Sequence, residues 1–568
     1  MSRLGAFVRA RQPAAPRGRS RRLRPAGCFL ALTALAAGAC SGAGAGGKDR
    51  LLVIEPGQSG QYVNNFNPFS TQSMLPSKGE IYEPLFFFNT GRTEPPRPLL
   101  ATGYSFTSGG RKLNLTLREG VTWSDGKPFS ATDVAYTFNL MAHDPKLNQY
   151  AVPITGATAV DATHVTVDFG KVAYTQLWYV AGLTFIVPEH IWKTVKDPST
   201  FTDTKPVGTG PFTLKTFTPQ AITIVKNTGY WEKGKPAIPG VRYVTYSSNA
   251  GSAAALMAGQ LDVAGIAMAN MDQFLKKSTT HHIAKVTMFI TNLEVNNRTF
   301  PTDDLAVRRA ISLGIDRDAV NRLAVKPTAG LAANPASPAQ LVLPQYQSFL
   351  SPQYKDLKFG YDPAAAEQAL TAGGYTKGSD GYYRKGGRKV SLTAQVIAGY
   401  TDQITVLQVI SQQLKKIGIE VKTQQESPAS FFGNRGQGRF QMLINNDGGG
   451  SVPFYTYKSL LYSKSVPGAT TLPNPVGFSD PAVDAALDTI ETTDPKNTAA
   501  LQRQYDVIEK AFVDKIPYIG LLQPLGAAEY LSTHLSGFPT EDNLYANPAP
   551  YQGPDNAMVL KNITPSQK

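Results

Sequence analysis

The feature that most constrains the fold is the alternation of strand patterns with helix patterns along the chain. Alternating apolar and polar residues predict strands at 112–120, 163–169 and 221–227. A capping box at Ser130–Asp133 precedes apolar residues at helical spacing and predicts a helix. Helix patterns also cover 406–417, where Gly418 and a strand follow, and 498–514, where the apolar IPYIGLL follows. No internal repeat of about 20–50 residues is present, so the chain is predicted to be an α/β protein.

Residues 1–39 are predicted to be a secretory signal peptide. Eight arginines and no acidic residue lie in positions 1–27, and an uncharged apolar run of 14 residues, Ala26–Ala39, follows. That run is shorter than the about 20 residues that a membrane-spanning helix needs. A basic segment, a short apolar segment and small residues before a cleavage point are typical of export signals. Removing 1–39 lowers the formal net charge from +14 to +6, so the basicity gives no argument for nucleic-acid binding.

Cleavage after Ala39 leaves Cys40 at the mature N-terminus. Cys28 is lost with the signal, so the mature chain holds a single cysteine and forms no internal disulfide. A cysteine in this position resembles the lipid attachment site of bacterial lipoproteins. An ordinary signal-peptidase site is the alternative, because Ala37 stands where lipoprotein signals usually have leucine. The prediction is export to the outer face of the cell membrane, with lipid on Cys40 and a tether of residues 40–50, or release into the periplasm.

No catalytic or cofactor motif is complete. Gly229–Pro236 matches a phosphate loop except at its last position, where proline replaces the hydroxyl residue that would hold Mg²⁺. Val207–Phe212 lacks the third glycine of a dinucleotide fingerprint. His281 and His282 are adjacent, so on a helix or a strand they point in different directions. The sequence therefore predicts no cofactor, no metal site and no enzymatic activity. A secreted hydrolase with a distant pair of acids is the remote alternative.

An ordered series of segments resembles the family 5 extracellular solute-binding proteins of ABC importers, the peptide- and nickel-binding type. The most specific is Leu115–Phe138, in which a strand ends, an Asp-Gly turn follows at 125–126 and a capped helix begins. The other segments, in order, are Asn64–Phe69, Ile81–Phe86, Pro206–Phe212, Asn227–Trp231, Ala255–Ala264, Leu293–Val320, Tyr361–Tyr375, Leu414–Val421 and Ile516–Leu522. Together they cover nearly all of 51–530.

The resemblance implies a two-lobed fold of the periplasmic-binding-protein type, with a ligand cleft between the lobes. Lobe I would comprise 51–289, with 524–568 returning to it, and lobe II would comprise 290–523. Crossing strands near 289–296 and 519–524 would act as the hinge. Such a receptor closes around its solute and docks on the transmembrane subunits of an ABC permease, without making or breaking a bond. We expect it to act as a monomer and to bind no nucleic acid.

The stretch INNDGGGSVPFYTY, Ile444–Tyr457, lies where the resemblance places the ligand contact of lobe II. In peptide-binding members an aspartate shortly before a proline pairs with the peptide's α-ammonium. Here that place falls at Gly449, and Asp447 lies two residues earlier. On an extended segment this keeps the same face but moves the carboxylate by about 7 Å. Oligopeptides are the first ligand hypothesis, because the resemblance favours them.

Oligosaccharides are the second ligand hypothesis, because amides and aromatic rings in and near this stretch suit an uncharged sugar. Core packing is the alternative reading of its two tyrosines. The predicted ligand-binding residues are Asn445, Asn446, Asp447, Tyr455, Tyr457, Trp178 and Asn65.

Overall fold

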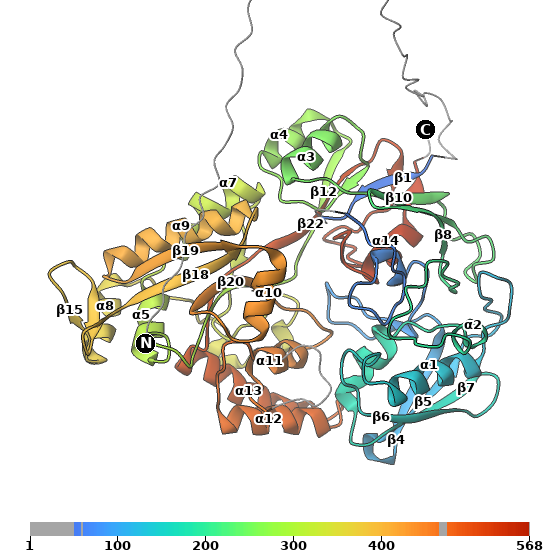
Figure 1. The fold of residues 1–568 in the computed structure, drawn as a ribbon, viewed down its shortest axis with the longest axis horizontal. Helices are drawn as coiled ribbons and strands as arrows, with labels where there is room; N and C mark the ends of the chain where they lie inside the picture. The colour runs from blue at the N-terminus through green and yellow to red at the C-terminus, as the bar shows by residue number, and fades with distance from the viewer. Residues whose placement is uncertain (1–49, 58–60, 465–473, 567–568) are drawn as a thin grey trace, which may run out of the picture. The chain divides into compact units, whose positions relative to one another are not determined.

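The computed structural model describes residues 50–57, 61–464 and 474–566, which all belong to one unit, Gly46–Lys568. The predicted signal peptide and Cys40 lie outside these residues. The larger sheets of the described chain have seven, six and four strands (Figure 1). We call the part built on the seven- and four-stranded sheets lobe I, and the part built on the six-stranded sheet lobe II.

Lobe I combines a mixed sheet with an antiparallel one. In the seven-stranded sheet β1 runs parallel to its two neighbours, β10 and β11. The sheet's order is β12 (His281–Thr287), β22 (Leu525–Leu531), β11 (Val263–Ala264), β1 (Leu52–Glu55), β10 (Gly240–Val244), β9 (Ala221–Lys226) and β8 (Phe212–Thr218). Helix α1 (Ala131–His143) packs on the antiparallel sheet, whose order is β4 (Ala101–Thr107), β5 (Lys112–Leu117), β7 (His164–Phe169) and β6 (Ile154–Ala159).

Lobe II is a mixed sheet with helices packed around it. Its order is β14 (Asn334–Pro335), β21 (Tyr518–Gln523), β13 (Ile290–Val295), β20 (Met442–Asp447), β18 (Ser391–Ile397) and β19 (Glu420–Glu426). Helix α9 (Thr401–Lys416) packs along β18 and β19, as Figure 1 shows. Further helices of this lobe are α5 (Leu305–Leu313), α8 (Pro363–Ala372), α10 (Pro428–Gly436), α11 (Pro453–Leu461), α12 (Pro481–Thr492) and α13 (Thr498–Lys515).

Two short segments carry the described chain from one large sheet to the other. Strand β12 of lobe I ends at Thr287, and β13 of lobe II begins at Ile290. On the return, β21 ends at Gln523 and β22 begins at Leu525. The two segments lie side by side, because β12 pairs with β22 and β13 pairs with β21, both antiparallel. A double connection of this kind suits a hinge between two bodies.

Local sequence signals explain where the elements begin and end. Ser130 donates its main-chain N–H to the Asp133 carboxylate at 3.0 Å, so the predicted capping box opens α1. Helix α9 stops just before Gly418, whose φ of +75° and close approach to the Gly381 carbonyl exclude a side chain. The strands and helices predicted from periodicity are confirmed, including α13 and the strand that follows it.

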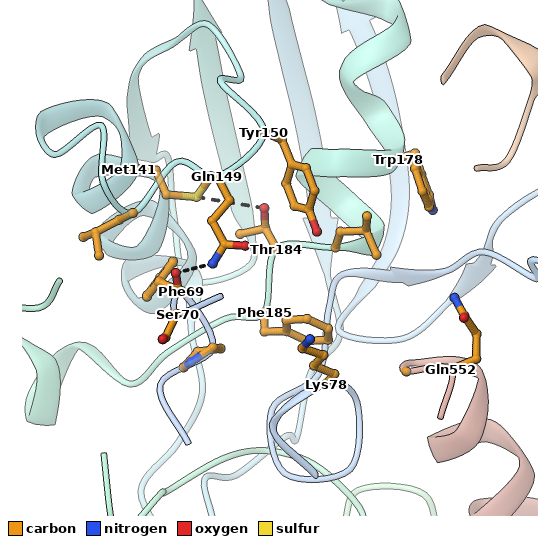
Figure 2. Close-up of a pocket in the computed structure, with 14 residues that line it drawn as sticks. Phe69, Ser70, Lys78, Met141, Gln149, Tyr150, Trp178, Thr184, Phe185 and Gln552 are labelled. Carbon is orange, nitrogen blue, oxygen red and sulfur yellow. Dashed lines mark hydrogen bonds between the residues drawn. The ribbon is translucent and has the colours of Figure 1, made fainter. Parts of the chain in front are cut away.

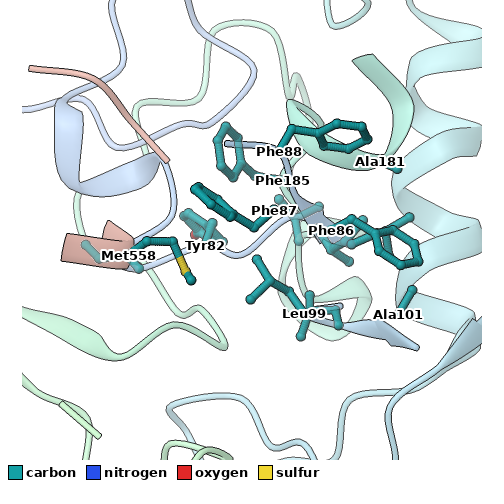
Figure 3. Packing of buried hydrophobic residues seen from close by; sticks show 14 of the residues in the cluster. Tyr82, Phe86, Phe87, Phe88, Leu99, Ala101, Ala181, Phe185 and Met558 are labelled. Carbon is teal, nitrogen blue, oxygen red and sulfur yellow. The ribbon is translucent and has the colours of Figure 1, made fainter. Parts of the chain in front are cut away.

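Each lobe has its own hydrophobic core. In lobe I, Phe86, Phe87 and Phe88 are buried together with Phe185, as Figure 3 shows. The core of lobe II includes Leu293 and the apolar face of α9. Because each lobe buries its own apolar surface, each can move as a body when the crossing segments bend. Among the described helices, none is both long enough and apolar enough to cross a bilayer.

Candidate functional site

A cavity of about 320 Å³, here called the central cavity, is lined by both lobes. Lobe II contributes the glycine loop that follows β20 and the start of α11, and lobe I contributes the rest. None of the described residues that line it carries a charged side chain. The lining residues are Thr90, Tyr150, Trp178, Tyr179, Leu183, Met288, Phe289, Gly448, Gly449, Gly450, Tyr455, Thr456, Ser459, Asn547 and Gln552.

An aromatic cluster forms one wall of the central cavity. Trp178 and Tyr179 lie on a π-helical turn, a rare geometry that is frequent at functional sites. Tyr179 stacks on Tyr150 with ring centroids 4.6 Å apart, and the ring of Tyr455 from α11 lies 4.7 Å from Trp178 and 5.0 Å from Tyr179. The hydroxyls of Tyr150 and Tyr179 make no hydrogen bond within the described chain. The wall therefore offers ring faces and free hydroxyls to a ligand.

The glycine loop brings main chain to the cavity in place of side chains. Gly449 and Gly450 have φ of +106° and +109°, a region that favours glycine, and a Cβ on Gly449 would meet open space. The loop is fixed from within lobe II, because Thr456 donates its hydroxyl to the Gly449 carbonyl at 2.9 Å and Tyr346 donates to the Gly450 carbonyl at 2.7 Å. The loop is thus a shaped surface with no charge of its own.

Lobe I adds a polar wall that is held from behind by Asp555. Its carboxylate accepts the Thr90 hydroxyl at 2.9 Å and the main-chain N–H of Asn547 at 2.8 Å. The Asn547 amide in turn donates to the Thr90 hydroxyl at 3.3 Å. Burial raises the pKa of Asp555 to about 7. Two cavity residues from distant parts of the chain are therefore positioned by one buried acid.

Polar contacts of Tyr455 and Glu491 join the lobes beside the cavity. Tyr455 of lobe II donates its hydroxyl to the carbonyl of Thr175 in lobe I at 2.6 Å. The buried carboxylate of Glu491 in lobe II lies 2.9 Å from the ammonium of Lys171 in lobe I and 2.7 Å from that of Lys458 in its own lobe. Although burial acts to raise it, the pKa of Glu491 is lowered by these two ammonium groups. The contacts hold the lobes in a closed arrangement.

The structure places the carboxylate of Asp447 in a lobe II network and not in the central cavity. Asp447 accepts from the Arg435 guanidinium at 3.0 Å, from the Asn292 amide at 3.0 Å and from the Asn445 amide at 2.9 Å. Arg435 also pairs with the buried Glu294 at 2.8 Å. Burial, and then the charge of Asp447, raise the pKa of Glu294. Asp447 and Asn445 are thus occupied by partners within the protein.

The other predicted site residues lie in different surroundings. Trp178 and Tyr455 both line the central cavity. Tyr457 is fully buried in the lobe II core, where its hydroxyl donates to the Ala339 carbonyl at 2.8 Å, so it does not line the cavity. Asn65 is buried in a lobe I turn, with its amide on the Ser70 hydroxyl at 3.0 Å. Asn446 lines a second cavity, described next.

Two smaller cavities adjoin the central one. The lobe I cavity, of about 220 Å³, shares Tyr150, Trp178, Leu183 and Gln552 with it (Figure 2). The hinge-side cavity, of about 180 Å³, shares Phe289 with it and lies against the crossing segments. No group of three or more His, Cys, Asp or Glu side chains in the described ranges could hold a metal ion.

Sequence reasoning missed several cavity residues. Tyr179 is adjacent to Trp178 and could have been proposed with it, because neighbouring aromatics on an exposed turn are a recognisable signal. Thr90, Asn547 and Gln552 carry no such signal. They meet at the cavity only because the C-terminal segment returns to lobe I. Asn547, for example, follows Thr90 by more than 450 residues along the chain.

Residues 95–468 match the model of the bacterial extracellular solute-binding proteins, family 5 (middle). The chain belongs to this family. This family 5 protein is 24% identical to the nickel-binding periplasmic protein of Escherichia coli (strain K12), over 81% of its own length and 88% of that protein's. It is 27% identical to the oligopeptide-binding protein AppA of Bacillus subtilis (strain 168), over 57% and 60% of the two lengths.

The fold is shared with a solved structure, the oligopeptide ABC transporter periplasmic binding protein of Thermotoga maritima with bound mannohexaose. The TM-score is 0.80 at 22% identity, and the match covers 92% of this chain and 99% of that one. Family membership makes this protein an extracytoplasmic solute-binding component of an ABC import system, and the structural match confirms the two-lobed fold.

Proposed function

We propose that this protein captures oligopeptides between its two lobes and delivers them to an ABC permease. The observation that supports this most is the central cavity, because residues of both lobes line it and closure therefore buries the solute. Relatives named for peptides, such as AppA, favour peptide cargo. The glycine loop suits a peptide main chain, since a ligand can approach the backbone at Gly449, where no side chain stands in the way.

The capture step is conformational. The open protein binds the solute, the lobes rotate about the two crossing segments, and the closed form docks on the permease. The contacts of Tyr455 and Glu491 across the lobes are broken when the lobes separate in this mechanism. No bond of the solute is made or broken, so the protein acts as a receptor and not as an enzyme. Lipid on Cys40 holds it at the outer face of the membrane, where it works as a monomer.

A second candidate, capture of oligosaccharides, is favoured by one specific observation. The described lining of the central cavity carries no charged side chain, and its aromatic wall has tyrosine hydroxyls with no partner among the described residues, which suits the faces and hydroxyls of sugar rings. The Thermotoga maritima neighbour carries mannohexaose. The acid that the sequence offered for a peptide's ammonium, Asp447, is paired inside lobe II.

A thermal-shift screen separates the two candidates. A ligand that binds only the folded protein raises its stability by RT ln(1 + [L]/Kd), about 2.7 kcal/mol at a hundredfold excess over Kd. We expect dipeptides to pentapeptides to raise the melting temperature and neutral manno- and cello-oligosaccharides to leave it unchanged. The reverse result would replace the peptide proposal with the sugar one. Turnover of any solute by the purified protein would contradict both.

A further inference from the structure

The lobe I cavity contains a lysine whose ammonium has no partner among the described residues. Lys78 follows the short turn Leu75–Ser77, and its side chain lines the cavity, as Figure 2 shows. Within residues 50–57, 61–464 and 474–566, no carboxylate pairs with its ammonium and no acceptor receives its hydrogens. Burial lowers the pKa of Lys78. A partly desolvated ammonium is costly unless it is paired, so an anionic partner from outside the chain would be stabilising.

The surroundings of Lys78 suit a carboxylate that is attached to an apolar group. None of the described residues lining this cavity is acidic, and its apolar lining includes Phe69, Met141, Leu147, Leu183 and Phe185. Phe185 lines the same cavity as Lys78, and Figure 2 shows Tyr150, Trp178 and Gln552 around the same space. The Gln552 amide makes no hydrogen bond within the described chain, so it remains available to the same ligand.

The ionisable groups that line the three cavities differ from one cavity to the next. The lobe I cavity carries the Lys78 ammonium, and the central cavity carries no charge. The hinge-side cavity carries the carboxyl groups of Asp402 and Glu529. The central cavity shares four lining residues with the lobe I cavity and Phe289 with the hinge-side cavity, so a ligand extended along the three would have one end at the ammonium and the other at the carboxyl groups. A peptide is complementary to this arrangement, because its carboxylate suits the ammonium, its uncharged amides suit the central cavity, and its ammonium can hydrogen-bond to the carboxyl groups.

We propose that Lys78 binds the carboxylate of the ligand, so that a peptide lies with its C-terminal residue in the lobe I cavity and its amino end toward the hinge. The apolar lining then receives the C-terminal side chain. This inference rests on the proposed capture of peptides and adds a direction and an anchor to it. A uronic acid at the end of an oligosaccharide presents the same chemistry, so the test includes both sources of carboxylate.

The test uses tripeptides to pentapeptides ending in phenylalanine, each as the free acid and as the C-terminal amide, measured by calorimetry on the full mature chain. Hydrogen bonds to charged groups contribute enough to predict that amidation weakens binding to the unaltered protein roughly 10- to 150-fold. In Lys78→Met the free acid should bind as weakly as the amide, whereas Lys78→Arg should keep the preference. Lys146→Met, the same change at an exposed lysine outside the cavity, should leave both affinities unchanged.

The possible failures are distinguishable. If the free acid and the amide bind equally to the unaltered protein, or if Lys78→Met keeps the preference, the Lys78 inference is wrong and peptide capture stands. If no peptide binds but a uronate-ended oligosaccharide binds and loses affinity in Lys78→Met, the carboxylate site stands and peptide capture is wrong. If neither source of carboxylate binds, both proposals fail. Equal melting temperatures of the variants without ligand exclude misfolding as the cause.

Discussion

The hydroxyl of Tyr455 provides a direct test of closure. In the closed arrangement it donates to the Thr175 carbonyl of the opposite lobe at 2.6 Å, and its ring lies in the aromatic wall. Tyr455→Phe removes the hydroxyl and keeps the ring. Tyr457→Phe is the matched control, because this tyrosine lies two residues away on the same helix and donates to the Ala339 carbonyl within lobe II at 2.8 Å.

The magnitude follows from the cost of one neutral hydrogen bond. Such a bond contributes about 0.5–1.5 kcal/mol net, so Tyr455→Phe should lower the ratio of closed to open protein about 2- to 13-fold. In the open form the Thr175 carbonyl is free to bond with water, so the loss falls on the closed form alone. Tyr457→Phe should lower the free energy of unfolding by a similar amount but leave the closure ratio unchanged, because its bond does not cross the lobes.

The closure ratio can be measured by double electron–electron resonance, which gives the distance between spin labels placed on α1 in lobe I and on α9 in lobe II. The ligand's Kd should rise in Tyr455→Phe by no more than the factor by which the closed fraction falls. If the two variants change the distance distribution equally, the hydroxyl of Tyr455 does not act between the lobes. The closed arrangement would then depend on the aromatic contacts alone.

Three further substitutions extend these tests. Glu491→Gln removes the ion pair across the lobes. It should lower the closure ratio by no more than about fivefold, because Lys171 of lobe I is more than half exposed. In the same distance measurement, the effect should vanish at high salt. Asp447→Asn should leave the peptide's Kd, measured by calorimetry, within about twofold. It should lower the free energy of unfolding by about 1–3 kcal/mol, because a buried hydrogen-bonded carboxylate is lost. A large loss of affinity would show that this carboxylate contacts the ligand. Burial raises the pKa of Glu529 to about 8, so the folded protein holds a proton that the unfolded chain releases near pH 4.5. Denaturant titrations should therefore show the free energy of unfolding falling between about pH 4.5 and 8, by up to about 1.4 kcal/mol per pH unit. Glu529→Gln should flatten this slope.

Much of the fold was predictable because its signals are local. The capping box before α1 and the glycine that ends α9 act within a few residues, and their effects on the backbone do not depend on the rest of the molecule. The pairing of strands is not local. Strand β22 lies between β12 and β11 because the C-terminal segment returns to lobe I, and only the family resemblance indicated that return.

The site was predicted less well than the fold, and the stretch after β20 shows why. The prediction there rested on residue types, amides and tyrosines, and residue type does not fix the direction of a side chain. The chain after Pro453 is helical, so Tyr455 and Tyr457 point about 200° apart, one toward the cavity and one into the core. A helix beginning at Pro453 follows from proline's preference for the first helical turn, a signal that this segment does carry.

The arrangement around Arg435 changes what the acidic residues of lobe II imply about ligand recognition. Strands β13 and β20 place Glu294 and Asp447 on one face, where two carboxylates would attract a ligand's ammonium. The guanidinium of Arg435, from α10, lies within 3.0 Å of both and occupies that position itself. A charged ligand end must therefore be bound by groups that the protein leaves unpaired. Among the described residues Lys78 is such a group, and a carboxylate at that position would neutralise a partly buried charge that no described side chain neutralises.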